Sequence, residues 1–113
     1  MIKHLDRIER KGLTLFKEKL LSELQKRVFS ITLFGSKARG DDHLESDIDL
    51  LVLVNRKDRQ LRNRIYDIAC DIEEECEYRI FLSPLVWDKK QFKTLLKHER
   101  KIALDIQKEG IQI

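Results

Sequence analysis

The chain has 113 residues, 42% of them hydrophobic, and a formal net charge of +3. These values predict a single domain over residues 1–113, and the positive excess is too slight to indicate nucleic-acid binding. Because no apolar run approaches the length of a membrane span and the first residues lack the apolar core of a signal peptide, we expect a cytoplasmic protein without membrane contact.

The first half of the chain predicts a helix followed by two strands. Apolar residues recur at helical spacing at Leu13, Phe16, Leu20 and Leu24. The run Val28 to Phe34 is short, rich in β-branched and aromatic residues and stops at Gly35, which is typical of a buried strand. A second strand is predicted from Asp47 to Val54, and its continuous apolar run after an acidic start is typical of a strand covered on both faces.

The second half predicts a helix, a strand and a final helical segment. Apolar spacing indicates a helix from Lys57 to Glu75. The run from Tyr78 to Trp87 predicts a strand, in which Pro84 indicates an edge position, a bulge or the strand end. Asp88 has a glutamine three residues later, a capping-box pattern that starts the last helical segment, and this segment ends at Gly110.

These elements predict an α/β (α+β) domain. Helices would flank a small mixed β-sheet of three to four strands. The pattern leaves the order of the strands in the sheet open.

A polar turn between the first two strands has the properties of a phosphate site. Gly35 has no β-carbon, so a phosphate can approach the backbone, and Ser36 supplies a hydroxyl and an amide as donors. If the four residues from Ser36 to Arg39 begin a short helix, their free amides face the same anion, and Arg39 can add a charged contact.

The second strand opens with two carboxylates, Asp47 and Asp49. Residues two apart in a strand project from one face, so both side chains point the same way while Ile48 points to the other side. Two hard oxygen donors fit Mg²⁺ better than zinc, and Mg²⁺ completes its shell with water and substrate phosphate. The turn and the strand would therefore meet at one nucleotide.

The stretch FGSKARGDDHLESDIDLLVLV contains Gly35 and Ser36, ten further residues, and then Asp47, Ile48 and Asp49. It resembles the minimal nucleotidyltransferase domains of the DNA polymerase β-like superfamily. The resemblance implies the polymerase β-like palm fold and Mg²⁺-dependent transfer of AMP from ATP to an acceptor hydroxyl. It further implies that Gly35 and Ser36 hold the triphosphate with support from Arg39, and that Asp47 and Asp49 are the catalytic metal ligands.

The resemblance also implies a partner. Such domains pair with a separately encoded, all-helical HEPN-type protein as toxin and antitoxin, the transferase acting as antitoxin by adenylylating its partner. A chain of this length leaves no room for the acceptor-recognising domain of larger relatives, so we expect another molecule to present the acceptor. Assembly as a homo-oligomer or a hetero-oligomer stays open, as does transfer to a small molecule.

One position departs from the family pattern. Catalytic members carry a third carboxylate on a later strand, and the corresponding position here falls near Phe81. Glu77 is the nearest acid, and in a strand it would share a face with residue 81, while residues 73–75 are expected to form an exposed helix end. The alternative hypothesis is therefore a binding module that neutralises or scaffolds its partner by contact alone.

A basic cluster follows the second strand, from Asn55 to Arg64. Such a cluster is usually a solvated helix face. The other interpretation is a surface that receives an acidic partner or nucleic acid.

Overall fold

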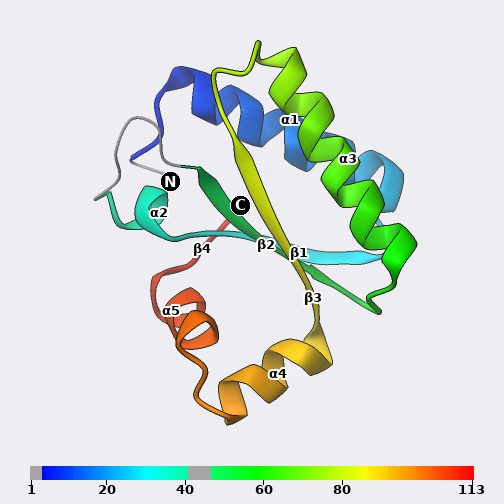
Figure 1. Ribbon diagram of the computed structural model, residues 1–113, viewed down its shortest axis with the longest axis vertical. Coiled ribbons are helices and arrows are strands. Elements are labelled where there is room, and N and C mark those ends of the chain that lie inside the picture. The colour runs from blue at the N-terminus through cyan, green and yellow to red at the C-terminus, as the bar shows by residue number, and fades with distance from the viewer. Residues whose placement is uncertain (1–3, 41–46) are drawn as a thin grey trace.

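The computed structural model describes residues 4–40 and 47–113 (Figure 1). Nine elements follow one another in the described residues: α1 (Arg7–Leu24), β1 (Val28–Phe34), α2 (Ser36–Arg39), β2 (Ile48–Val54), α3 (Arg59–Glu75), β3 (Leu82–Asp88), α4 (Lys89–Lys97), α5 (Lys101–Glu109) and β4 (Ile111–Gln112). No helix in these two ranges has both the length and the hydrophobicity needed to cross a membrane.

The four strands form one mixed sheet in the order β3-β2-β1-β4. Strand β1 runs antiparallel to both β2 and β4, whereas β2 and β3 are parallel. The mixed sheet flanked by helices confirms the predicted fold class. Pro84 lies in β3, an edge strand of the sheet, as its missing amide hydrogen predicted.

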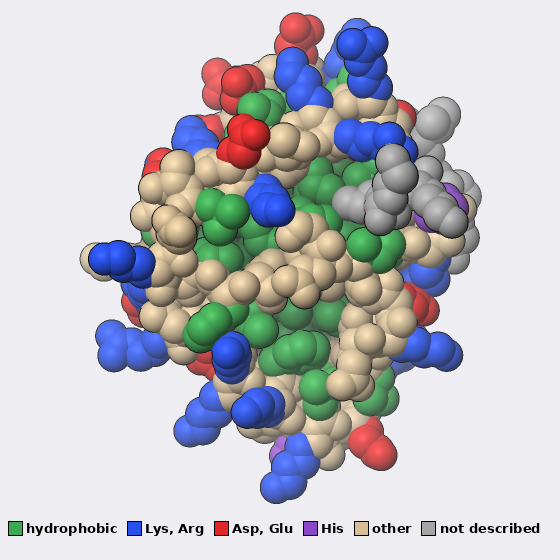
Figure 2. All heavy atoms as spheres, turned by 180° about the vertical axis from the view of Figure 1, so that it is seen from behind, with side chains coloured by type: hydrophobic (Ala, Val, Ile, Leu, Met, Phe, Trp, Pro, Cys, Tyr) green, Lys and Arg blue, Asp and Glu red, His purple; other side chains and the backbone are tan. Residues whose placement is uncertain are grey.

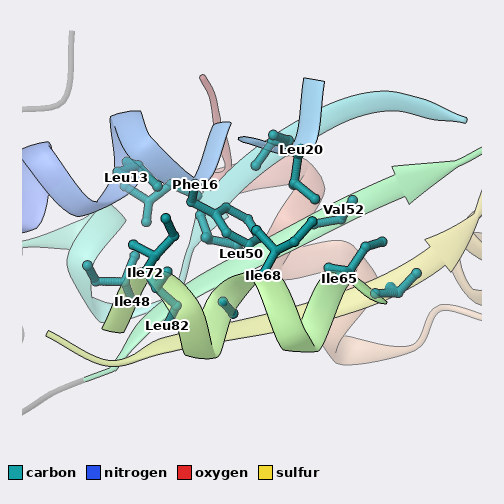
Figure 3. Close-up of a cluster of buried hydrophobic side chains, with 14 of the residues drawn as sticks. Leu13, Phe16, Leu20, Ile48, Leu50, Val52, Ile65, Ile68, Ile72 and Leu82 are labelled. Atoms are coloured by element: carbon teal, nitrogen blue, oxygen red, sulfur yellow. The ribbon is translucent and has the colours of Figure 1, made fainter. Parts of the chain in front are cut away.

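Helices cover both faces of the sheet and make two hydrophobic clusters. Helices α1 and α3 lie on one side, where the larger cluster packs between them and β2 (Figures 1 and 3). The smaller cluster joins Leu51 and Trp87 to Ala103 and Ile106 under α4 and α5. Since Leu50 and Leu51 point into different clusters and both are buried, β2 is covered on both faces, as its continuous apolar run predicted.

Two aspartates cap the helices that follow the sheet's strands. The side chain of Asp58 accepts a hydrogen bond from the amide of Leu61 (2.8 Å) at the start of α3. The side chain of Asp88 accepts one from the amide of Gln91 (2.7 Å) at the start of α4, as the capping pattern predicted. Both helices therefore begin at the end of the sheet where β2 and β3 finish.

Strand β3 starts later than the sequence pattern indicated. The predicted strand began at Tyr78, but β3 begins at Leu82. The preceding chain turns, because Glu77 and Tyr78 both have left-handed backbone angles, with φ of 55° and 57°. Neither is a glycine, so nothing in their identity signals this conformation.

The end of the chain also differs from the prediction. The last helical segment is two helices, α4 and α5, separated by a turn in which Glu99 has φ of 53°. Strand β4 has two residues and pairs with Thr32 and Leu33 of β1. A strand of two residues is too short to show an alternation of apolar and polar residues in the sequence, and it forms only by pairing with the strand beside it.

Candidate active site

The turn after β1 leads directly into the short helix α2, which meets the condition under which its first amides could face an anion. Gly35 precedes the helix with φ of +74°, a conformation that L side chains rarely adopt. Its carbonyl oxygen accepts hydrogen bonds from the amides of Ala38 and Arg39, both at 3.1 Å. The first amides of a helix have no acceptor within the helix. The amides of Ser36 and Lys37, at the start of α2, can therefore donate hydrogen bonds to an anion.

The turn and the acidic strand are in contact. Phe34, the last residue of β1, pairs in register with Asp49 of β2. A β-carbon added to Gly35 would lie 2.4 Å from Oδ2 of Asp49. The carboxylate is therefore packed against the backbone of the turn, which brings together the two parts that the sequence placed ten residues apart.

The two aspartates differ in their surroundings. Asp47 is exposed and directly precedes β2, whereas Asp49 is half-buried within it. Burial raises the pKa of the Asp49 carboxyl above its usual value, and the negative charge of Asp47 raises it further. Arg39 acts in the opposite direction and lowers this pKa. The pair thus concentrates negative charge that a cation would relieve.

Arg39 connects the site to the far end of the chain. Its guanidinium Nη1 lies 3.0 Å from Oε2 of Glu109 on α5. It is also an electrostatic neighbour of Asp49. Glu109 of helix α5 therefore helps to position the guanidinium of Arg39 near Asp49.

A buried ion pair behind the turn was missed by sequence reasoning. The Nζ atom of Lys37 lies 2.5 Å from Oε2 of Glu9, and the two residues are only 3% and 8% exposed. Glu9 also forms the capping box of α1, accepting from the amide of Asp6 (2.9 Å) while Asp6 accepts from the amide of Glu9 (2.8 Å). This network joins α2 to α1. No local pattern signals the pair, because its members come from separate elements.

The start of β3, which lies beside the aspartates, offers no third carboxylate. In the parallel pairing of β2 and β3, Asp49 lies opposite Ser83, and the amide of Ile48 donates to the carbonyl of Phe81 (2.8 Å). Phe81 therefore flanks Asp47 and is 48% exposed. Within residues 4–40 and 47–113, no group of three or more His, Cys, Asp or Glu side chains could hold a metal ion.

The surroundings of two glutamates, Glu77 and Glu73, differ from those that the sequence predicted. Glu77 is not in a strand but in the turn after α3, beside Lys11 and Arg79, so the alternation argument that placed it with residue 81 was wrong. Glu73 is half-buried and not on an exposed helix end. Its Oε2 accepts a hydrogen bond from the amide of Leu82 (2.8 Å) and so braces the first residue of β3.

The donor set fits one class of metal. Asp47 and Asp49 provide carboxylate oxygens only, and burial together with the negative charge of Asp47 raises the pKa of Asp49. Mg²⁺ is bound by one or two carboxylates together with water and substrate phosphates. The two side chains would hold such an ion on the face of the sheet opposite α1 and α3.

A separate surface hollow does not belong to this site. It has a volume of about 410 Å³ and lies between α1 and the last residues of the chain. Its walls are Leu5, Arg10, Leu13, Thr14, Lys17 and residues 111–113. None of the turn or strand residues that form the candidate site lines it.

Comparison with known proteins gives matches over most of the chain. The family described as "Nucleotidyltransferase domain" matches residues 14–108. A curated relative, "Putative protein adenylyltransferase MJ0141" of Methanocaldococcus jannaschii, is 37% identical over 83 residues, which span 70% of this chain and 78% of the relative.

Solved structures share the fold. A crystal structure of a toxin-antitoxin with AMP-PNP superposes with a TM-score of 0.53 at 24% identity, over 86% of this chain and 68% of that one. A mutant of the toxin-antitoxin MntA-HpeT gives a TM-score of 0.52 at 24% identity, with the same coverage. At this level of identity, the likeness concerns the arrangement of helices and strands.

Proposed function

This chain belongs to the nucleotidyltransferase domain family, and we propose that it transfers AMP from ATP to a hydroxyl group on a partner protein, with Mg²⁺ as the metal. The observation that carries this proposal is the packing of Asp49 against Gly35. That contact puts the glycine-serine turn and the two carboxylates at one point, where a nucleotide could touch both.

Each residue of the proposed site has a distinct role. The backbone of Gly35 and the hydroxyl and amide of Ser36 bind the phosphates, because a turn without a side chain allows close approach. Arg39 adds positive charge beside them. Asp47 and Asp49 are the metal ligands.

The reaction is a displacement at phosphorus. The acceptor oxygen forms a bond to the α-phosphorus of ATP, the bond from that phosphorus to the β-phosphate oxygen breaks, pyrophosphate leaves and the hydroxyl proton passes to solvent. When bound, Mg²⁺ neutralises charge on the phosphates. The chain's own contribution is orientation: α2 is held by the Lys37–Glu9 pair, and Gly35 keeps the phosphates beside Asp49.

We propose a HEPN-type helical toxin as the partner, with this chain as its antitoxin. Two observations support this pairing. The curated relative is named as a protein adenylyltransferase, which favours an acceptor on a protein. The solved structures that share the fold are described as toxin-antitoxin.

A second candidate function is binding without transfer. It is favoured by Phe81 and Ser83, which stand beside the aspartates where a third carboxylate would be expected. A site with two carboxylates could hold the nucleotide while the domain neutralises its partner by contact.

One experiment separates the two functions. The chain is incubated with the proposed HEPN-type helical partner, ATP and Mg²⁺, and both chains are examined by intact-mass spectrometry. Transfer predicts addition of AMP to the partner, lost in the Asp47→Asn, Asp49→Asn double variant and retained in Asp71→Asn, which changes an exposed carboxylate paired with Lys19. Complex formation with unchanged masses would instead support contact alone.

A further inference from the structure

The end of the sheet remote from the aspartates carries a concentration of positive charge. Strand β2 runs from the candidate site to Val54, which lies in register with Val28 at the start of β1 and with Asp88 at the end of β3. The chain segments that adjoin this end carry eight basic residues, which we call the basic pole: Lys26, Arg27, Arg56, Lys57, Arg59, Arg62, Lys89 and Lys90.

Hydrogen bonds tie these segments together. The guanidinium of Arg27 donates from Nε to Oδ1 of Asn55 (2.9 Å) and from Nη2 to the carbonyl of Arg56 (2.7 Å). The amide of Asn55 donates in return to the carbonyl of Arg27 (2.9 Å). Lys57 reaches α4, with its Nζ 3.4 Å from Oε1 of Gln91. The basic pole is therefore one surface and not three unrelated clusters.

Few carboxylates offset this charge. Asp58 and Asp88 each accept a helix-capping hydrogen bond, and Asp58 is also paired with Arg27 (3.1 Å). Nearby Glu23 is occupied by two hydrogen bonds from Arg64 (2.7 and 2.6 Å). Among the described residues, no carboxylate forms an ion pair with the other seven basic side chains of the pole.

Exposed aromatic rings lie among the basic side chains. Phe29 is 51% exposed, and Nζ of Lys89 lies 3.6 Å from the centroid of its ring. Tyr66 is 38% exposed, and the guanidinium carbon of Arg62 lies 5.8 Å from its ring centroid. Figure 2 shows Lys and Arg side chains along the left and lower margins of the rear face, with hydrophobic side chains between them.

We propose that the basic pole binds single-stranded nucleic acid. Lysine and arginine side chains contact the phosphates, and Phe29 stacks on a base. Exposed rings set among basic side chains are the combination that single-stranded nucleic acid uses, since bases stack on the rings while the cations bind the phosphates, so the pole favours nucleic acid, and an acidic polypeptide is tested as the alternative. This surface is independent of the proposed transfer, because it lies at the opposite end of β2 from Asp49.

The test is fluorescence anisotropy of the full chain with a labelled single-stranded RNA of about 20 nucleotides, repeated with single-stranded DNA of the same sequence, across a salt series. We expect binding to both, weakening as salt rises. The triple variant Arg56→Gln, Arg59→Gln, Lys90→Gln should lose about tenfold or more in affinity and show a shallower salt dependence. Phe29→Ala should weaken binding without changing the salt slope.

The matched control is Lys11→Gln, Lys97→Gln, Lys108→Gln, which removes the same charge from exposed positions outside the pole. It should bind nearly as well as the unchanged protein. Three results would overturn the proposal: no binding to either strand at low salt, equal losses in the two triple variants, or stronger binding of poly-L-glutamate than of RNA at the pole. Circular dichroism of each variant confirms that the fold is retained.

Discussion

The side chain of Asp49 occupies the space that a β-carbon on Gly35 would need, so no larger residue fits at position 35 without displacing it. A β-carbon at position 35 would lie 2.4 Å from Oδ2 of Asp49 and 3.3 Å from its Cγ. The glycine therefore serves two purposes, since its φ of +74° also turns the chain from β1 into α2. The proposed phosphate turn and the proposed metal strand are coupled through this single contact.

The first prediction follows from that contact. Gly35→Ala should weaken binding of Mg²⁺·ATP about tenfold or more, because the new methyl group displaces Asp49 and strains the turn. Isothermal titration calorimetry measures the affinity. Gly40→Ala is the control: it has φ of +86°, but its β-carbon would meet the side chain of His4 and not a carboxylate. Equal losses of affinity in both variants would contradict the role assigned to Gly35.

The second prediction concerns the charge of Asp49. Because its pKa is raised in the folded state by burial and by Asp47, ionisation of Asp49 opposes folding at pH values above that pKa, and the penalty disappears as the pH falls below it. Asp49→Asn should therefore stabilise the metal-free protein at neutral pH, by less than about 1 kcal/mol because the group is partly solvated. The gain should vanish in acid.

Urea unfolding at several pH values measures this effect. Added Mg²⁺·ATP should raise the melting temperature of the unchanged protein and have little effect on Asp49→Asn, since a ligand stabilises only a form that binds it. A destabilised Asp49→Asn protein at neutral pH would argue against uncompensated charge at the site.

The third prediction concerns the buried pair behind the turn. Lys37→Met should destabilise the fold by about 3–5 kcal/mol, because it leaves the carboxylate of Glu9 buried without its partner. Glu9→Gln combined with Lys37→Met should recover most of this loss, since glutamine keeps the hydrogen bond to the amide of Asp6 without the charge.

The exposed pair of Arg64 and Glu23 provides the comparison. Arg64→Met should destabilise the fold far less than Lys37→Met, because exposed ion pairs contribute little to stability. Chemical denaturation of the four proteins gives the free energies of unfolding. If Lys37→Met proved as mild as Arg64→Met, the buried pair would not be what holds α2 to α1.

The fourth prediction tests the position beside Asp47. Phe81 is 48% exposed, so Phe81→Asp should fold, and it places a carboxylate directly before β3, beside Asp47. We expect tighter binding of Mg²⁺ and AMP transfer faster by about tenfold or more, because a third carboxylate can bind metal and accept a proton. Phe81→Asn controls for loss of the ring. Equal rates in the two variants would show that the negative charge is not what the site lacks.

Much of the fold and the candidate site was predictable because the signals are local. Strand β1 has the predicted bounds, and β2 and α3 begin one or two residues later than expected. Gly35 and Asp49 meet across a single connection between two neighbouring strands, so residue type and spacing were enough to bring them together. The start of β3 was not predictable, because the left-handed conformations of Glu77 and Tyr78 have no signal in their residue types.

The sequence by itself determined the glycine-serine turn and the paired aspartates, since these depend on short-range geometry in one stretch of chain. Only the tertiary structure decided what surrounds them. The parallel register of β2 and β3 places Phe81 and Ser83 beside the aspartates, and the packing of α1 against α2 buries Lys37 with Glu9. The same packing gathers basic residues from three segments at one pole, although the whole chain carries only +3. Pairings between distant segments arise from the summed packing of both cores, which no local pattern contains.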